Sequence, residues 1–266
     1  MLFYTPSSMN SILHQVPLPF FAIIIFAIIL LAHLLGVKIG SYQKRKNPDA
    51  VEEGIGPLGT ALLGLLSLLL SFTFSMSASR YDSRRSAIVN EANNISTVIL
   101  NADLYPDSIR TDLRNDLKQY VDERIRYYQC GDEEEINISF IKAQTIYLKI
   151  WKKIATLSHD PSNIVRSYHM IPAMDKIAAA ATSRDALRTA RVPYSIIWLL
   201  IMLTLLGSFI IGYGKKQKKN DWIMLFIYAL MTVITLYTIL DLDHSTSGLI
   251  QTKTTHTKIE ELKDLF

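Results

Sequence analysis

Hydroxyl groups inside an apolar segment are the polar side chains with the most regular spacing in this sequence. Thr60, Ser67, Ser71 and Ser75, together with Gly64, recur at intervals of three or four residues. On a helix this spacing places small side chains on one face, where they allow another helix to approach closely and to hydrogen-bond across the contact. A hydroxyl-rich face can also line a water-filled path. Helix packing and pore lining both remain open, and an oligomer can combine them.

Charged residues follow this stripe directly. The segment after it reads RYDSRR and places Arg80, Asp82, Arg84 and Arg85 at the edge of the apolar segment. Basic residues at a pore entrance concentrate anions, and hydroxyl donors replace part of an anion's hydration shell. The alternative is that these arginines pair with acidic groups while the stripe packs against another helix.

Other kinds of chemistry find little support in the sequence. The six histidines lack the spacing of metal ligands, and neither a P-loop nor a nucleophile elbow is present. The glycines between Gly54 and Gly59 match a dinucleotide fingerprint, but a membrane segment follows them instead of a solvent-facing helix. The basic runs KRK and KKQKK lie in short loops between apolar segments, where membrane topology explains them. We therefore expect no enzyme, catalytic residue, cofactor, metal site or nucleic-acid partner.

Four apolar segments are long enough to cross a lipid bilayer. The region between the second and third segments has helical periodicity and a mixed charged surface, typical of an aqueous module. Because no Gly or Pro interrupts the chain between Gly64 and Leu100, the second span is expected to continue as one long helix into that module. We predict an all-α fold with spans near 17–37, 57–79, 192–213 and 222–240, and with domains at 1–79, 80–191 and 192–266.

The distribution of basic residues predicts an orientation in the plasma (inner) membrane. The two short loops hold eight Lys and Arg residues, and the positive-inside rule makes their side cytoplasmic. Both termini and the helical module are then extracytoplasmic. Arginines beside the spans on the opposite face weigh against this orientation.

A cluster of charges is expected at the membrane edge of the module. With four spans, the end of span two, the start of span three and the end of span four share one face. Crowded cations repel one another, and a buried charge without a partner is costly. We therefore expect a carboxylate at the end of span four to pair with an arginine, preferably one from Arg80 to Arg85. The residues of this predicted edge are Arg80, Asp82, Arg84, Arg85, Arg188, Arg191, Asp241 and Asp243.

Two sequence motifs resemble those of the bestrophin-like family of prokaryotic multipass membrane proteins, a family classed as a domain of unknown function. The first consists of FTFS at Phe72 to Ser75, RYDSRR at Arg80 to Arg85 and EAN at Glu91 to Asn93. The second is Leu242-Asp243 followed by Gly248, with Ser245 where the family usually has proline.

The resemblance implies an oligomeric channel. Bestrophins are oligomeric anion channels in which the second helix runs from the membrane into the aqueous module and lines the pore. By this analogy the chain forms a homo-oligomer, a pentamer, in the lipid bilayer and passes small inorganic ions. Phe72 and Phe74 match the aromatic neck of such pores, whereas the calcium-binding acidic segment of bestrophins has no counterpart here. The alternative is a non-conducting membrane scaffold or sensor whose helical module binds a partner.

Overall fold

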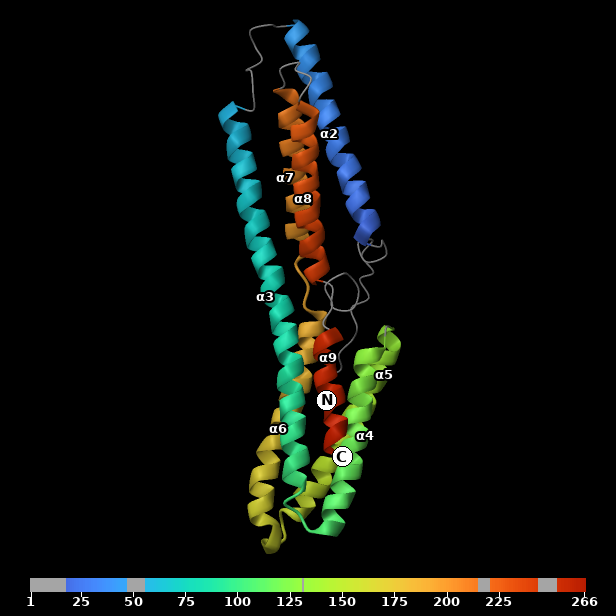
Figure 1. Ribbon diagram of the computed structural model, residues 1–266. Helices are drawn as coiled ribbons and strands as arrows, with labels where there is room; N and C mark the ends of the chain where they lie inside the picture. Colours follow the sequence, from blue (N-terminus) through green and yellow to red (C-terminus); the bar gives the residue numbers. More distant parts are fainter. Residues whose placement is uncertain (1–17, 47–55, 131, 215–220, 244–252) are drawn as a thin grey trace. The chain divides into compact units, whose positions relative to one another are not determined.

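The computed structural model describes residues 18–46, 56–130, 132–214, 221–243 and 253–266, and over these residues the chain is helical with no strand (Figure 1). The predicted all-α fold is confirmed, and four of its helices are long and apolar enough to cross a membrane. The glycine-rich segment at Gly54, the basic loop at 215–219 and the motif residues Ser245 and Gly248 lie outside the described residues. The α-helices are α2 (Leu18–Lys46), α3 (Gly56–Ala102), α4 (Asp107–Gln129), α5 (Glu133–Leu157), α6 (Ile164–Thr189), α7 (Tyr194–Tyr213), α8 (Asp221–Asp243) and α9 (Lys253–Glu260).

The chain divides into two compact units. The first comprises residues 1–79 and 191–244, and the second comprises 80–190 and 245–266. The long helix α3 has 47 residues and contributes to both units. At 1.5 Å per residue it is about 70 Å long. The predicted continuation of span two as one helix is therefore confirmed.

Close backbone contact between α2 and α7 organises the first unit. A Cβ atom added to Gly36 would lie 2.1 Å from the Phe209 carbonyl oxygen, and one added to Gly212 would lie 2.3 Å from the His33 carbonyl oxygen. Ser208 Oγ donates a hydrogen bond to the Ile29 carbonyl oxygen at 2.8 Å. Small residues thus let the two helices touch through their backbones, as is typical of helix pairs in membranes.

The same contact explains why α2 is longer than its predicted span. The first span is predicted to end near residue 37, but α2 continues to Lys46. A Cβ atom added to Gly40 would lie 2.4 Å from the Tyr213 carbonyl oxygen, so α2 still packs on α7 beyond the predicted end of the span. Tertiary packing thus extends the helix through a segment that composition alone assigns to a loop.

A helical core fills the second unit. Ile95, Leu117, Ile154 and Met174, from four different helices, are at most 1% exposed and belong to one apolar cluster. The C-terminal tail belongs to this unit as well, although the sequence analysis grouped it with the last two spans. Its Ile259 is fully buried in the same cluster. Apolar residues of the tail therefore complete the core of the module.

Candidate functional site: the exposed face of helix α3 and its charged continuation

The hydroxyl stripe of the second span is exposed along its whole length. Its members are Thr60, Gly64, Ser67, Ser71 and Ser75. A Cβ atom added to Gly64 would meet no described atom within 4 Å. At 100° per residue, the buried residues Leu66 and Thr73 lie on the side of the helix opposite Ser71. The stripe therefore faces away from the described helices of the first unit.

Two hydroxyl groups of the stripe donate to their own helix. Thr60 Oγ1 donates to the Gly56 carbonyl oxygen and Ser67 Oγ donates to the Leu63 carbonyl oxygen, both at 3.0 Å. Such bonds to the carbonyl four residues earlier satisfy a hydroxyl in an apolar environment. The oxygen lone pairs remain available as acceptors, and a hydroxyl must rotate away from its carbonyl before it can donate to a passing ion.

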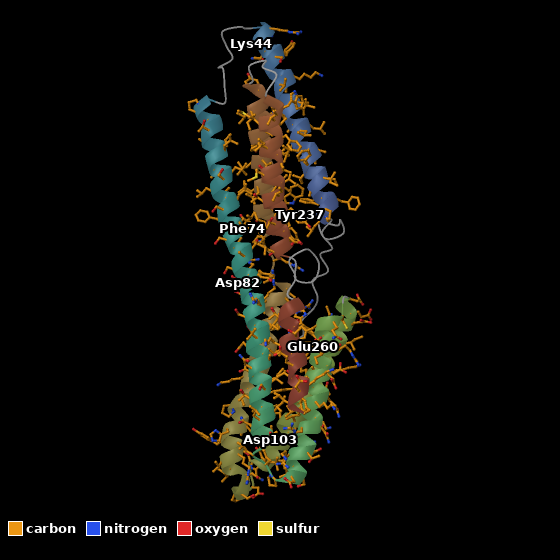
Figure 2. The ribbon with its side chains drawn as sticks, in the orientation of Figure 1. Lys44, Phe74, Asp82, Asp103, Tyr237 and Glu260 are labelled. Atoms are coloured by element: carbon orange, nitrogen blue, oxygen red, sulfur yellow. The ribbon has the colours of Figure 1, made fainter. Side chains whose placement is uncertain are left out.

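Two aromatic side chains border the stripe. Phe72 is 64% exposed and Phe74 is 42% exposed. Figure 2 labels Phe74 on α3. By helix periodicity they lie about 100° and about 60° from Ser71, on its two sides. They therefore flank the hydroxyl face and do not interrupt it.

The RYDSRR segment presents different charges to different sides of α3. Asp82 and Arg85 are exposed and, with Val89 and Asn93, line a shallow surface hollow of the second unit. Arg84 is only 6% exposed, and Arg80 is half-buried. Among the three arginines of this segment, Arg85 is therefore the one most accessible to an ion in solution.

Asp243, the predicted edge residue at the end of span four, binds the start of α7. Both of its carboxylate oxygens accept a hydrogen bond from the Val192 N–H, at 3.1 and 3.0 Å. The helix cap, Pro193, makes no side-chain capping bond, so a carboxylate from α8 supplies negative charge where the helix dipole favours it. Arg191 Nη1 also donates to the main-chain carbonyl of Asp243 at 2.6 Å.

The remaining residues of the predicted edge have separate positions. Arg188 Nε lies 3.4 Å from an oxygen of Asp185 on its own helix, and Asp241 is 1% exposed within the first unit. The expected pair between Asp241 or Asp243 and an arginine of 80–85 would join residues of the two units. That pair stays a prediction.

The second unit contains a buried ion cluster that the sequence does not predict. The carboxylate of Glu91, which is fully buried, accepts hydrogen bonds from Arg124 Nε at 2.5 Å and from Arg184 Nη1 at 3.0 Å. The Tyr128 hydroxyl donates to the same carboxylate at 2.6 Å. The cluster thereby connects α3, α4 and α6. Glu91 opens the EAN motif, but nothing in the sequence links it to arginines 33 and 93 positions away.

Burial and the shared carboxylate act differently on the two arginines. Burial works against the charge of Arg124, but the Glu91 carboxylate outweighs it and raises the pKa of that guanidinium above its ordinary value. Burial lowers the pKa of Arg184 to about 9; Glu91 opposes this effect and the neighbouring positive charge of Arg124 adds to it. Aromatic rings cover both cations, with Arg124 Cζ 4.5 Å from the centroid of Tyr127 and Arg184 Cζ 3.3 Å from that of Tyr128.

Comparison with solved structures finds the same fold in bacterial membrane proteins. A bestrophin homologue from Klebsiella pneumoniae, crystallised as a point mutant, superposes with a TM-score of 0.70 at 14% sequence identity, covering 96% of this chain and 98% of that one. Another mutant structure of a bestrophin homologue from this organism gives 0.65 at 16% identity, with coverages of 91% and 98%. A further crystallised membrane protein gives 0.60 at 17% identity, with the same coverages.

The structural likeness shows the fold, and sequence comparison shows the family. Among curated proteins, no match was found. The Bestrophin-like domain, however, matches residues 19–257, which is most of the chain. With its apolar helices, the chain is a membrane protein that belongs to the bestrophin-like family.

Proposed function

We propose that this protein is the subunit of a homo-oligomeric channel for small anions, with the hydroxyl stripe of α3 facing the central axis. The observation that carries the proposal is the exposure of Thr60, Ser67 and Ser71 on the side of α3 opposite its buried face. Lipid offers no hydrogen-bond donor to the outward oxygen lone pairs of this face, whereas a water-filled axis or a neighbouring subunit supplies one. The family resemblance supports the same arrangement, since in bestrophins the second helix lines the pore of an oligomer. By the same analogy, the expected oligomer is a pentamer.

Selectivity for anions rests on the arginines beyond the stripe. Arg85 is exposed on α3, and a ring of such residues around an axis raises the local anion concentration. The back-bonded hydroxyls of Thr60 and Ser67 act in the opposite direction, because their outward oxygen lone pairs suit cations. The arginine ring is therefore expected to determine which sign of charge is passed.

The test is the current carried by purified protein in planar bilayers under a salt gradient. The unmodified protein is expected to carry a current whose reversal potential lies near that of chloride. Ser71→Trp should abolish the current by blocking the axis. Leu65→Trp is the matched control: Leu65 is also exposed, at 44%, but lies about 120° from Ser71 around the helix. Absence of any current, or equal loss in both variants, would contradict the proposed pore.

Assembly gives an independent check. Ser71→Leu should shift the oligomer distribution or reduce flux, whereas Ser71→Ala keeps the small volume and should change neither. Arg85→Gln should move the reversal potential away from that of chloride without changing assembly. A monomeric protein in mild detergent and in lipid nanodiscs would contradict the oligomer.

The second candidate function is a non-conducting scaffold or sensor. It is favoured by apolar side chains exposed near the start of α6, where Val165 is 73% exposed and Tyr168 is 75% exposed. Exposed apolar side chains that share one helix face are typical of protein-binding surfaces. A protein that forms oligomers but carries no current under any salt gradient would favour this function.

A further inference from the structure

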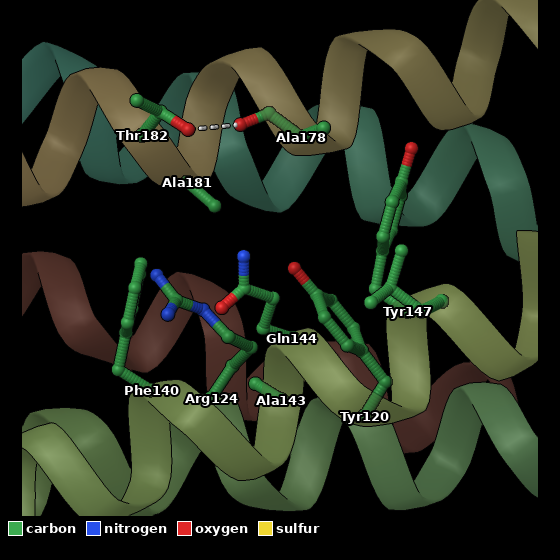
Figure 3. Close-up of a pocket in the computed structure, with 10 residues that line it drawn as sticks. Tyr120, Arg124, Phe140, Ala143, Gln144, Tyr147, Ala178, Ala181 and Thr182 are labelled. Carbon is green, nitrogen blue, oxygen red and sulfur yellow. Dashed lines mark hydrogen bonds between the residues drawn. The ribbon is translucent and has the colours of Figure 1, made fainter. Parts of the chain in front are cut away.

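A cavity in the second unit lies between α4, α5 and α6 and has a volume of about 120 Å³. Figure 3 shows Arg124, Gln144 and Tyr120 on one side of it and Ala181 and Thr182 on the other. Gln144 and Thr182 are exposed at its rim, whereas Arg124 and Tyr120 are buried. The cavity is therefore open to solvent at the rim, where Gln144 and Thr182 lie, and has the charged group of Arg124 at its buried end.

Arg124 brings hydrogen-bond donors to this cavity that are not used elsewhere. Its side chain is 1% exposed, and its Nε binds Glu91. Nη1 and Nη2 have no hydrogen-bond partner among the described residues. Nearby aromatic rings, including Phe140 with its centroid 6.0 Å from Cζ, stabilise the cation but do not satisfy N–H groups in the guanidinium plane. Buried donors without partners are costly, so the site favours an acceptor.

The charge of the surrounding cluster points to an anion. Arg124 and Arg184 share the single carboxylate of Glu91, so these three side chains keep one excess positive charge. The low pKa of Arg184, caused by its burial and its proximity to Arg124, reflects this incomplete compensation. A bound monoanion would neutralise the cluster, whereas a neutral ligand would not.

We propose that this cavity binds a small monocarboxylate with a short hydrocarbon chain. The planar guanidinium fork matches the two oxygens of a carboxylate. Burial raises the pKa of Tyr120, which keeps its hydroxyl protonated as a further donor, and the amide of Gln144 supplies another. Thr182 Oγ1 donates to the Ala178 carbonyl oxygen at 2.9 Å, so its hydroxyl is not expected to donate to the carboxylate as well.

The walls and volume of the cavity limit the size of the hydrocarbon chain. Phe140, Ala143 and Ala181 supply apolar surface around the polar end. A cavity of about 150 Å³ holds benzene, so the volume of about 120 Å³ suits acetate, propionate or butyrate. A single mono-anionic head group and a two- to four-carbon body are therefore the expected features of the ligand.

Calorimetric titration of the full-length protein in detergent tests the proposal without reference to any ion current. Sodium acetate, propionate and butyrate are titrated at constant ionic strength, with sodium chloride as the reference salt. At least one carboxylate is expected to bind with a dissociation constant of about 1 mM or lower. Ala181→Leu fills the cavity without removing a charge from the ion cluster and should weaken binding at least about tenfold. Gln144→Leu should weaken it about three- to tenfold.

Ala179→Leu is the matched control, because Ala179 is an exposed neighbour on α6 outside the cavity lining. It should leave the dissociation constant unchanged. Absence of carboxylate binding in the unmodified protein, or an equal effect of Ala181→Leu and Ala179→Leu, would overturn the proposal. Equally strong displacement of butyrate by chloride would also overturn it, by showing an inorganic anion site instead. Loss of channel activity with retained carboxylate binding would leave this inference standing, so its failure is distinguishable from that of the proposed channel.

Discussion

Arg124 Nε lies 2.5 Å from Oε1 of Glu91, and the two side chains are 1% and 0% exposed. This buried pair fastens α4 to α3, and Arg184 adds α6 through the other carboxylate oxygen. A buried charge whose partner is lost has neither water nor a counter-ion to stabilise it. The pair therefore determines whether the helices of the second unit can pack together.

Removing the carboxylate of Glu91 should destabilise the protein severely. Glu91→Gln leaves two buried guanidinium groups without a counter-charge, and the expected loss is about 3–5 kcal/mol. Thermal unfolding of the purified protein in detergent measures the change. Asp107→Asn is the control, because Asp107 forms an ion pair with Arg110 but is 90% exposed; its effect should be within about 0.5 kcal/mol. Similar melting temperatures for Glu91→Gln and Asp107→Asn would contradict the structural role of the cluster.

Asp116 should make part of the stability depend on acidity. Its side chain is 3% exposed and binds Lys149 at 2.7 Å and Lys153 at 2.6 Å. Burial would raise the pKa of Asp116, but the two lysines outweigh burial and lower it. Because the folded pKa is the lower one, the stabilisation is complete above the ordinary carboxyl pKa near 3.8 and is lost as the pH falls through the folded value.

The variant Asp116→Asn measures this contribution. At pH 7 it should be less stable than the unmodified protein by about 1–2 kcal/mol, a modest value because both lysines are partly exposed. The difference should shrink as the pH falls below about 3.8. A difference of constant size from pH 7 to pH 3 would show that the carboxylate charge is not what stabilises this site.

The glycines of α2 and α3 should respond oppositely to the same substitution. Gly36→Ala pushes a methyl group against the Phe209 carbonyl oxygen and should separate α2 from α7, with loss of about 1–3 kcal/mol. Gly64→Ala meets open space and replaces glycine by a better helix former, so the subunit should be as stable or slightly more stable. The melting temperatures of the two variants, compared with that of the unmodified protein, measure these effects. Equal destabilisation by both variants would contradict the assigned contacts.

The predicted orientation is tested by fusion of a reporter to the C-terminus. The basic residues of the short connections, among them Lys44 and Arg45 at the end of α2, are expected in the cytoplasm. Alkaline phosphatase fused after Phe266 should then be active, because that enzyme needs an extracytoplasmic location. A fluorescent-protein fusion at the same site should be dark. Fluorescence without phosphatase activity would reverse the orientation.

The sequence predicts the elements of this protein better than the contacts between them. Uninterrupted helical periodicity predicts α3 correctly, because neither Gly nor Pro follows Gly64 within it. The extension of α2 to Lys46 was missed, since it depends on α7, a partner distant in the sequence. The Gly36-x-x-x-Gly40 spacing could have revealed this contact, because small residues four positions apart are typical of close helix pairs.

For the charged sites, too, the sequence predicts the residues better than their contacts. The charged residues from Arg80 to Arg85 are close together in the chain, which predicts a shared charged edge. Arg84 is nevertheless buried, and only part of the segment is exposed. The Glu91 cluster gathers side chains from three helices, and no spacing rule connects them. Glu91 and Asp243 both belong to motifs that carried the family resemblance, and the structure gives each a physical role.

Asp243 should be needed for the start of α7. Asp243→Ala removes the acceptor of the buried Val192 N–H, and a buried donor left without a partner costs about 1–3 kcal/mol. Asp243→Asn keeps one acceptor oxygen but loses the charge that favours a helix N-terminus, so a smaller loss of about 0.5–1 kcal/mol is expected. Thermal unfolding and protease sensitivity at residues 190–193 measure both variants. If alanine and asparagine have equal effects, Asp243 acts through its charge alone and not as a hydrogen-bond acceptor for Val192.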